Sequence, residues 1–265
     1  MNTLPSLSEL ISLKGKIALI TGSAIGIGKT IAYRFAEAGA DLELVDINKR
    51  GLRTVKRELS KFKSEVNIHG VDVSQKDAID ALWQELAGEE PDILVNNAGI
   101  YPFKNFLEVD ETFLKKVMDV NLSSAFWMCH NMIKSRLKKG GIIINISSIE
   151  AILPFASDLV PYDISKTGVI ALTRALAKEY GRNGFRINVI IPGGILTPGT
   201  RAVAKQLYQF DVGVLKSGVQ YKIRLPMGRG GQPDEVARVA LFLASDLSSY
   251  VHGAMVTVDG GFLST

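Results

Sequence analysis

The chain has 265 residues, of which 46% are hydrophobic and 22% are charged, and its formal net charge is +4. This is the composition of a globular protein with a sizeable core, and the basic excess is too small to indicate nucleic-acid binding. Basic residues cluster only near 49–63, which we interpret as a solvated helix face. Since no run approaches the roughly 20 apolar residues of a membrane span and residues 1–13 do not resemble a signal peptide, we expect a cytoplasmic protein without a membrane partner.

Cys129 is the only cysteine in the chain. A single cysteine excludes an intramolecular disulfide and any multi-cysteine metal site, and it suits a reducing compartment. The three histidines, His69, His130 and His252, have no ligand-like spacing. The sequence therefore predicts no metal.

Short β-branched runs alternate with longer helical patterns along the chain. An amphipathic stretch at Ser6–Leu13 is either a short helix, packed on the domain or on a neighbouring subunit, or a frayed leader. After it, the predicted strands are Lys16–Thr21, Asp41–Asp46, Val66–Val71, Ile93–Val95, Gly141–Ile146, Arg186–Ile191 and Ala254–Val258. The predicted helices are Gly26–Ala38, Arg50–Phe62, Ala78–Ala87, two stretches within Glu111–Lys138, Tyr162–Tyr180 and Pro233–Ala244.

This alternation predicts an α/β fold with a parallel, doubly wound sheet of seven strands. The strands at Ile142–Ile146 and Asn188–Ile191 are continuously apolar, as expected where helices cover both faces of a sheet. No linker, low-complexity tract or repeat divides the chain. We therefore predict one domain at 15–265 after an N-terminal extension at 1–14, with a loop-rich substrate segment at about 193–231.

A glycine-rich turn, Thr21–Gly28 (TGSAIGIG), leaves the first strand and opens a helix. Small residues there allow a pyrophosphate to approach backbone N–H groups at the helix N-terminus. The TGxxxGxG spacing alone also fits a tight turn or a methyl-donor site. Dinucleotide binding is thus one of several interpretations until the context is considered.

Asp46 ends the second predicted strand, about 20 residues beyond the loop. A carboxylate there can accept hydrogen bonds from both hydroxyls of an adenosine ribose, and it would repel a 2′-phosphate. The alternative is an aspartate that starts a turn with Asn48. Lys49 and Arg50 lie close by and would tolerate NADP, but the glycine loop itself contains no basic residue, so NAD is favoured.

Tyr162 and Lys166 lie one helical turn apart, which brings an ammonium close to a phenol. A free phenol has a pKa of roughly 10, and a neighbouring cation favours phenolate. Ser147 and Ser148 follow the fifth strand, at the sheet edge where open α/β folds bind ligands; alternatively they cap the next turn. Asn121 lies within a helical stretch, where it either kinks the helix, is buried with a partner, or holds water.

Taken in chain order, the motifs of this sequence resemble those of the short-chain dehydrogenase/reductase family along nearly the whole chain. The motifs are TGSAIGIG at Thr21–Gly28, Asp72-Val73, Asn96–Gly99, Asn121, Ser148, Tyr162–Lys166 and Pro192–Thr197. The resemblance implies a Rossmann fold. It also implies an enzyme that acts on CH–OH groups with NAD or NADP, of which Asp46 favours NAD, and, from the segments Gly228–Pro233 and Val258–Gly261, a homotetramer.

The resemblance assigns roles by position. It implies Tyr162 as general acid and base, Lys166 as the residue that holds the nicotinamide ribose and lowers the pKa of the tyrosine, and Ser148 as the group that polarises the carbonyl. Asn121 would anchor a proton-relay water. Together with Tyr162 and Lys166, the implied cofactor contacts are Gly22, Ser23, Ile25, Gly26, Ile27, Gly28, Asp46, Ile47, Asp72, Val73, Asn97, Ala98, Gly99, Pro192, Gly193, Ile195 and Thr197.

One departure from the family pattern is an interval from Ser148 to Tyr162 that is one residue longer than usual, which leaves open which serine faces the substrate; Ser148 is favoured. Glu150 would either touch a polyhydroxy substrate or face solvent, and solvent is favoured. The pocket could be lined by aromatic residues and by the later loop, namely Tyr101, Phe103, Phe155 and Ala202–Tyr221.

The sequence favours an NAD-dependent oxidoreductase that interconverts a secondary alcohol, such as a polyol or sugar, and its carbonyl. A reductase of 3-oxoacyl groups on acyl carrier protein is the first alternative. Such family members usually take NADPH, so Asp46 argues against it. A non-catalytic dinucleotide-sensing protein is the second alternative, and the intact set of Asn121, Ser148, Tyr162 and Lys166 argues against that.

Overall fold

The computed structural model describes residues 4–200 and 224–265. Its centre is a seven-stranded sheet in the order β3-β2-β1-β4-β5-β6-β7, in which every neighbouring pair is parallel. This confirms the predicted doubly wound α/β fold. The strands are β1 Ile17–Thr21, β2 Asp41–Val45, β3 Val66–His69, β4 Ile93–Asn96, β5 Gly141–Ile146, β6 Phe185–Pro192 and β7 Met255–Val258.

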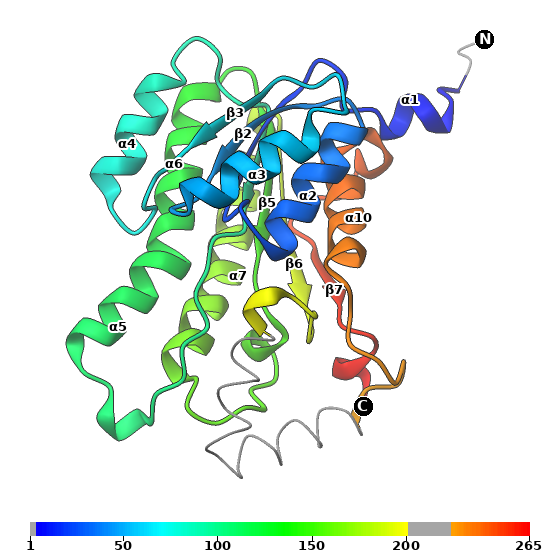
Figure 1. The fold of residues 1–265 in the computed structure, drawn as a ribbon. Coiled ribbons are helices and arrows are strands. Elements are labelled where there is room, and N and C mark those ends of the chain that lie inside the picture. The colour runs from blue at the N-terminus through cyan, green and yellow to red at the C-terminus, as the bar shows by residue number, and fades with distance from the viewer. Residues whose placement is uncertain (1–3, 201–223) are drawn as a thin grey trace.

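Helices cover both faces of this sheet (Figure 1). Side chains of α2, α3 and α10 form one core with residues such as Ala18 and Ile20 of β1. Side chains of α4, α6 and α7 form a second core with the intervening Leu19. Successive strand residues thus point to opposite, equally buried faces. The helices are α1 Leu7–Ile11, α2 Gly26–Glu37, α3 Lys49–Leu59, α4 Lys76–Glu85, α5 Glu111–Met118, α6 Ser124–Arg136, α7 Val160–Tyr180 and α10 Pro233–Ala244.

The amphipathic stretch near the N-terminus forms the short helix α1. A capping box starts it, in which the N–H of Ser6 donates to the Glu9 carboxylate at 2.6 Å and the N–H of Glu9 donates to the Ser6 hydroxyl at 3.3 Å. No side chain of α1 is buried, and the helix projects from the sheet layers (Figure 1). Among the described helices, none is long and apolar enough to cross a membrane.

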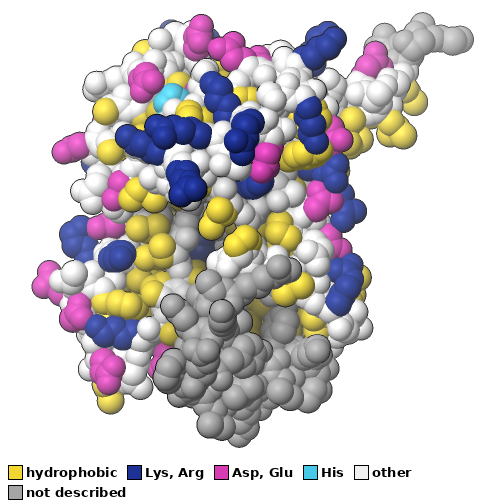
Figure 2. Space-filling model, in the orientation of Figure 1, with side chains coloured by type: hydrophobic (Ala, Val, Ile, Leu, Met, Phe, Trp, Pro, Cys, Tyr) yellow, Lys and Arg dark blue, Asp and Glu magenta, His cyan; other side chains and the backbone are white. Residues whose placement is uncertain are grey.

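The basic cluster lies on α3, where it forms the solvated face that the sequence predicts. Leu52, Val55 and Leu59 are buried against the sheet. The basic residues between them are exposed, and Figure 2 shows Lys and Arg side chains gathered over this part of the surface. The α3 helix is therefore amphipathic in the ordinary sense.

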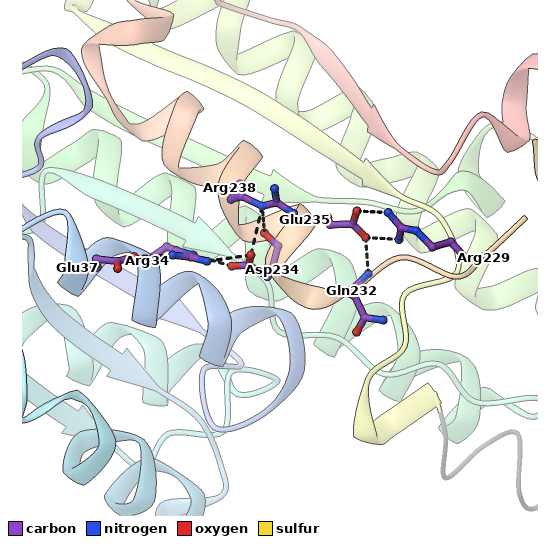
Figure 3. A network of polar contacts seen from close by, with 7 residues as sticks. All are labelled: Arg34, Glu37, Arg229, Gln232, Asp234, Glu235 and Arg238. Carbon is purple, nitrogen blue, oxygen red and sulfur yellow. Dashed lines mark hydrogen bonds and ion pairs between the residues drawn. The ribbon is translucent and has the colours of Figure 1, made fainter. Parts of the chain in front are cut away.

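A network of charged residues fastens α10 to α2 (Figure 3). Arg34 of α2 donates two hydrogen bonds to Asp234, at 2.6 and 2.9 Å. Arg229 donates two to Glu235, at 2.8 and 2.7 Å, and Glu235 also accepts from the N–H of Gln232 at 2.8 Å. Forked arginine–carboxylate pairs of this kind fix orientation as well as distance. The Arg34–Asp234 pair ties α10 to the helix that begins with the glycine loop, and the Arg229–Glu235 pair ties the segment before α10 to α10 itself.

The two described ends of the predicted substrate segment lie against each other. Ile195 and Gly231 form a parallel bridge, in which the N–H of Leu196 donates to the Gly231 carbonyl at 2.8 Å and the N–H of Gly231 donates to the Gly194 carbonyl at 3.0 Å. The stretch Ala202–Tyr221, which the sequence places beside the substrate, lies outside the described residues. The domain limits at 1–14 and 15–265 stay a prediction.

Candidate active site

The glycine loop between β1 and α2 has no room for a side chain at two positions. A Cβ at Gly28 would lie 2.3 Å from the Gly22 carbonyl oxygen and 2.5 Å from Asn97 Nδ2. Gly22 has a φ of +65°, and a Cβ there would lie 2.8 Å from Ala98 Cα. The Asn97 amide donates to the carbonyls of Thr21 and Gly22, both at 3.0 Å. The loop backbone thus packs directly against the segment that follows β4.

Thr21, the last residue of β1 and the first of the glycine-rich motif, organises the same corner, although the predicted cofactor contacts do not include it. Its hydroxyl oxygen accepts hydrogen bonds from the N–H groups of Asn97 and Ala98, both at 3.0 Å, and donates to the Val95 carbonyl at 3.4 Å. In the sequence, the only sign of this role is a hydroxyl side chain at the strand end, directly before Gly22. The Thr21 hydroxyl holds the ends of β1 and β4 together.

A groove of about 570 Å³ lies at the carboxyl edge of the sheet, over the glycine loop. Most predicted cofactor contacts line it: Gly22, Ile25, Gly26, Ile27, Asp46, Ile47, Asp72, Val73, Asn97, Ala98, Gly99 and Thr197. Ser23 and Gly28 lie behind its wall, where Ser23 is buried and donates to the Val45 carbonyl at 3.2 Å. A groove over a crowded glycine turn at a helix N-terminus, with an acid in its wall, fits a dinucleotide.

Asp46 both shapes the loop and faces the groove. One carboxylate oxygen accepts from the Ala24 N–H at 3.0 Å and the other from the Asn48 N–H at 2.8 Å. The turn with Asn48, offered by the sequence as an alternative, is therefore present. A carboxylate has about four acceptor positions, so it retains capacity for ribose hydroxyls. Asp72 forms a similar turn and accepts from the Ser74 N–H at 3.0 Å.

A second cavity, of about 270 Å³, adjoins the groove near the ends of β5 and β6. Ser148, Tyr162 and Lys166 line it together. Pro192, Gly193 and Ile195 also line it. The two cavities share the wall residues Ile27, Asn97, Gly99, Ile100, Tyr101, Thr197 and Thr200. The structure thus brings three of the four predicted catalytic side chains to one pocket beside the groove, while their chemical roles stay predictions.

The two serines after β5 have different surroundings. The Ser147 hydroxyl donates to the Lys166 carbonyl at 2.8 Å, which holds β5 against α7. Ser148 caps the turn Ile149–Ala151 by accepting from the Glu150 N–H at 3.2 Å, and it also hydrogen-bonds the phenol of Tyr162. Ser148 is therefore the serine that contacts Tyr162. The loop between the two residues accommodates an interval that is one residue longer than in the family pattern.

Tyr162 and Lys166 lie close together in a poorly solvated part of the pocket. Lys166 Nζ donates to the Ile146 carbonyl at 3.0 Å and lies 5.9 Å from the centre of the Tyr162 ring. Burial lowers the pKa of Lys166 to about 8. Burial also raises the pKa of Tyr162 above its usual range, and the hydrogen bond with Ser148 opposes this only in part. This shift is opposite to the one expected from a neighbouring cation, because removal from water is the largest effect.

Asn121 lies in a π-helical segment, Asp119–Ser123, between α5 and α6. Its side chain is buried and lines neither cavity. The amide oxygen accepts from the Ile100 N–H at 2.8 Å, and the amide nitrogen donates to the Ile100 carbonyl at 3.0 Å and to the Ser165 hydroxyl at 3.1 Å. Of the expected alternatives, an irregular helix and a buried side chain with partners both occur.

Aromatic side chains form one wall of the pocket. The ring of Tyr101 packs edge to face on Tyr162 with 4.7 Å between centroids, and Phe103 packs on Tyr101 at 4.9 Å. Tyr101 and Phe155 line the cavity, whereas Phe103 lies behind Tyr101. Two of the three aromatic residues suggested by the sequence therefore face the pocket.

Glu150 is buried, with 2% of its surface exposed, so the expectation that it faces solvent is wrong. The following loop folds back over it, and one carboxylate oxygen accepts from the Phe155 N–H at 3.0 Å. The other oxygen has no hydrogen-bond partner among the described residues. Burial raises the pKa of Glu150 to about 7 and that of nearby Asp163 to about 6. Two carboxyl groups of raised pKa thus lie near Tyr162.

Glu150→Gln is expected to stabilise the protein at neutral and alkaline pH. The pKa of Glu150 is raised from 4.5 to about 7, so the wild type loses stability as the pH rises through that interval. Because the amide does not ionise, the advantage of the variant in unfolding free energy should grow by about 3 kcal/mol over the same interval. Urea unfolding at a series of pH values measures it, with the exposed Glu89→Gln as control. A difference independent of pH would contradict the expectation.

The family of the chain follows from comparison with known proteins. A family model described as Enoyl-(Acyl carrier protein) reductase matches residues 22–263, which is nearly the whole chain. A crystal structure of a short-chain type dehydrogenase/reductase from Mycobacterium marinum covers 98% of the chain with a TM-score of 0.89 at 29% identity. The protein is a short-chain dehydrogenase/reductase.

Relatives of this short-chain dehydrogenase act on different substrates. A 3-oxoacyl-(acyl-carrier-protein) reductase FabG of Aquifex aeolicus is 35% identical over 95% of this chain and 98% of its own. A galactitol 2-dehydrogenase (L-tagatose-forming) of Cereibacter sphaeroides is 36% identical over 94% of this chain and 96% of its own. The L-sorbose reductase of Gluconobacter frateurii, complexed with NADPH and L-sorbose, has a TM-score of 0.89 at 32% identity and covers 97% of this chain and 99% of its own.

These comparisons establish the coarse activity of this short-chain dehydrogenase. It is an oxidoreductase of a family that acts on CH–OH groups and binds a nicotinamide dinucleotide. The relatives include both acyl-carrier reductases and polyol dehydrogenases, and at least one was studied with NADPH. Substrate and cofactor choice therefore depend on the residues of this chain.

Proposed function

We propose that this short-chain dehydrogenase interconverts a secondary alcohol, such as a polyol or sugar, and its carbonyl with NAD. The observation that carries the proposal is a pair of adjoining cavities, with Asp46 in the wall of one and Ser148, Tyr162 and Lys166 in the other. The nicotinamide, when bound, accepts or donates the hydride. The residues of the chain then have to orient the substrate oxygen and move one proton.

Tyr162 is the proposed proton donor and acceptor. Its raised pKa keeps the phenol neutral, which is the form that gives a proton to a carbonyl oxygen. Ser148, hydrogen-bonded to the phenol, would hold the same substrate oxygen. Lys166 would favour the phenolate when an alcohol is oxidised, and it would hold the nicotinamide ribose. Asn121 is proposed to anchor a water behind this group.

The choice of NAD rests on Asp46. Its carboxylate faces the groove and would repel a 2′-phosphate while accepting hydrogen bonds from ribose hydroxyls. The neighbouring Lys49 and Arg50 are exposed, at the start of α3. The L-sorbose reductase complexed with NADPH shows that the phosphorylated cofactor occurs among relatives. Cofactor choice is therefore a property to test directly.

Asp46→Ala is expected to raise the ratio of kcat/KM with NADP to kcat/KM with NAD by about tenfold, because hydrogen bonds from the ribose to a charged acceptor are lost. Asp46 also holds Ala24, but loosening the loop should affect both cofactors alike, since they share the pyrophosphate. Steady-state kinetics with both cofactors measures the ratio. Asp41→Ala, at the opposite end of β2, is the matched control. An unchanged ratio would show that Asp46 does not discriminate between the ribose hydroxyls of NAD and the 2′-phosphate of NADP.

The alternative, a reductase of 3-oxoacyl thioesters, is favoured by the identity with the Aquifex enzyme. Two features argue against it. Asp46 opposes the 2′-phosphate of NADPH, and the pocket wall contains the buried carboxyl of Glu150, which an acyl chain would leave unsolvated.

A substrate panel tests the proposed function. The protein is assayed with NAD(H) and NADP(H) on polyols, sugars, simple secondary alcohols, their ketones and 3-oxoacyl thioesters, by the absorbance of the reduced nicotinamide. Turnover of an alcohol–ketone pair with NAD(H) supports the proposal. Preference for the thioester with NADPH would establish the reductase. No turnover on any substrate would favour a dinucleotide-sensing protein.

A homotetramer is part of the same proposal. Apolar side chains are exposed on two long helices, with Phe126 and Leu137 at α6 and Ile164 on α7. Covering such side chains in an interface between copies would remove apolar surface from water.

A further inference from the structure

Glu150 is a buried carboxyl residue in the wall of the pocket that contains Ser148, Tyr162 and Lys166, and one of its oxygens has no hydrogen-bond partner among the described residues. Only 2% of the residue is exposed, and it lines the cavity of about 270 Å³. One carboxylate oxygen is engaged by the Phe155 N–H at 3.0 Å. The other has no hydrogen-bond partner of good geometry within the described part of the chain, although the backbone of Ala156 also lowers the pKa of this carboxyl group. The wall of the pocket therefore contains a carboxyl oxygen whose hydrogen-bonding capacity the described residues do not fully use.

The position of Glu150 is fixed relative to the reacting groups. It lies two residues after Ser148, on the short turn that Ser148 caps, and its own N–H donates to the Ser148 hydroxyl at 3.2 Å. Its charge acts on the phenols of Tyr162 and Tyr101. Ser148, Tyr162 and Glu150 line the same cavity of about 270 Å³, so a substrate whose oxygen lies between Ser148 and Tyr162 shares that cavity with Glu150.

The chemistry of this acceptor selects among substrate groups. A buried carboxylate oxygen needs a hydrogen-bond donor, and leaving it without one is costly. A hydroxyl supplies such a donor. A substrate carboxylate or phosphate at this place would be repelled, and an alkyl group would leave the oxygen unsatisfied. The pocket wall is thus complementary to a neutral hydroxyl group.

We propose that Glu150 determines specificity by accepting a hydrogen bond from a second substrate hydroxyl, on the carbon next to the one that is oxidised. The enzyme then prefers vicinal diols and polyols to alcohols with one hydroxyl. This inference rests on the function proposed above and names the substrate class of the same site.

Two other roles for Glu150 predict different results. If the carboxylate only fastens the loop through Phe155, its loss should impair all substrates alike. If it acts only by raising the pKa of Tyr162, then neutralising Asp163, which raises the same pKa, should have the same effect. Asp163 does not line the cavity, which makes Asp163→Asn a matched control.

The test measures kcat/KM on two matched pairs, vicinal cyclohexanediol with cyclohexanol and vicinal butanediol with secondary butanol. The wild type should prefer the diol in at least one pair. Glu150→Leu should lower kcat/KM for that diol about tenfold or more, while the value for the matched alcohol stays equal or rises. Glu150→Gln, which keeps an acceptor oxygen, should retain part of the preference. Asp163→Asn should change both members of a pair by the same factor.

The outcomes separate this inference from the proposed function. If the wild type turns over no alcohol and no matching ketone, the proposed function fails. If it does, but shows no diol preference, or Glu150→Leu lowers both members equally, only the role of Glu150 fails. Melting temperature and NADH binding show whether Glu150→Leu is misfolded. If it is, the ratio of kcat/KM for the diol to kcat/KM for the matched alcohol is compared between Glu150→Gln and the wild type. An equal ratio overturns the proposal, and a lower ratio in Glu150→Gln supports it.

Discussion

Tyr162→Phe is expected to lower kcat by about 10²- to 10⁴-fold, which is the range associated with loss of a positioned general acid or base. The phenyl ring keeps the edge-to-face contact with Tyr101, so the pocket should keep its shape. Only the proton and its hydrogen bond with Ser148 are lost. NADH binding, followed by nicotinamide fluorescence, should be nearly unchanged, so the defect should appear in kcat rather than in cofactor affinity.

Tyr101→Phe is the matched control, because this second phenol lines the same cavity and is also poorly solvated. Its kcat should fall by much less than that of Tyr162→Phe. Should Tyr162→Phe keep wild-type turnover while Tyr101→Phe loses it, the two tyrosines would have to exchange the roles proposed for them.

Gly28→Ala is expected to weaken dinucleotide binding about a hundredfold. The new methyl would lie 2.3 Å from the Gly22 carbonyl oxygen and 2.5 Å from Asn97 Nδ2, and neither is the end of a long, adaptable side chain. Relieving such an overlap costs about 3 kcal/mol and has to move the turn that would hold the pyrophosphate. Titration with NADH measures the dissociation constant.

Gly199→Ala serves as the control for this variant. Gly199 lines the same groove, but a Cβ there would meet only the Thr197 hydroxyl, at 3.7 Å, which is an ordinary contact. Its affinity for NADH should match that of the wild type. Unaltered affinity in Gly28→Ala would mean that the crowded turn is not part of the cofactor site.

The sheet could be predicted because its determinants are local. Alternating apolar strands and amphipathic helices specify parallel βαβ units, and the structure has all seven expected strands. One helix start was also predicted closely: the sequence predicts a helix from Tyr162, and α7 begins at Val160 with Pro161 in its first turn, where proline is favoured. The pattern did not predict the order of the strands in the sheet, because which strands pair depends on contacts between segments that are distant in the sequence.

The order of the motifs predicted which side chains meet in the site, but it did not predict the pKa shifts of those side chains. Ser148, Tyr162 and Lys166 do meet in one pocket. The upward pKa shift of Tyr162 depends on how much water the folded pocket excludes, and no local pattern encodes that. The burial of Glu150 has the same origin, since it depends on a loop that folds back to present the N–H of Phe155.

The π-helical segment Asp119–Ser123 also shows how one extra residue fits between α5 and α6. The hydrogen bonds of a π-turn join residues five apart, so its five residues turn the chain about as far as four residues of an α-helix do. The helix that follows therefore keeps its face, and Met128, Cys129 and Met132 of α6 stay fully buried against the sheet. Deleting one residue here would restore a regular helix with little rotation of α6, but it would change the side chain opposite Ile100, so the extra residue matters for the contacts of Asn121 rather than for the packing of α6.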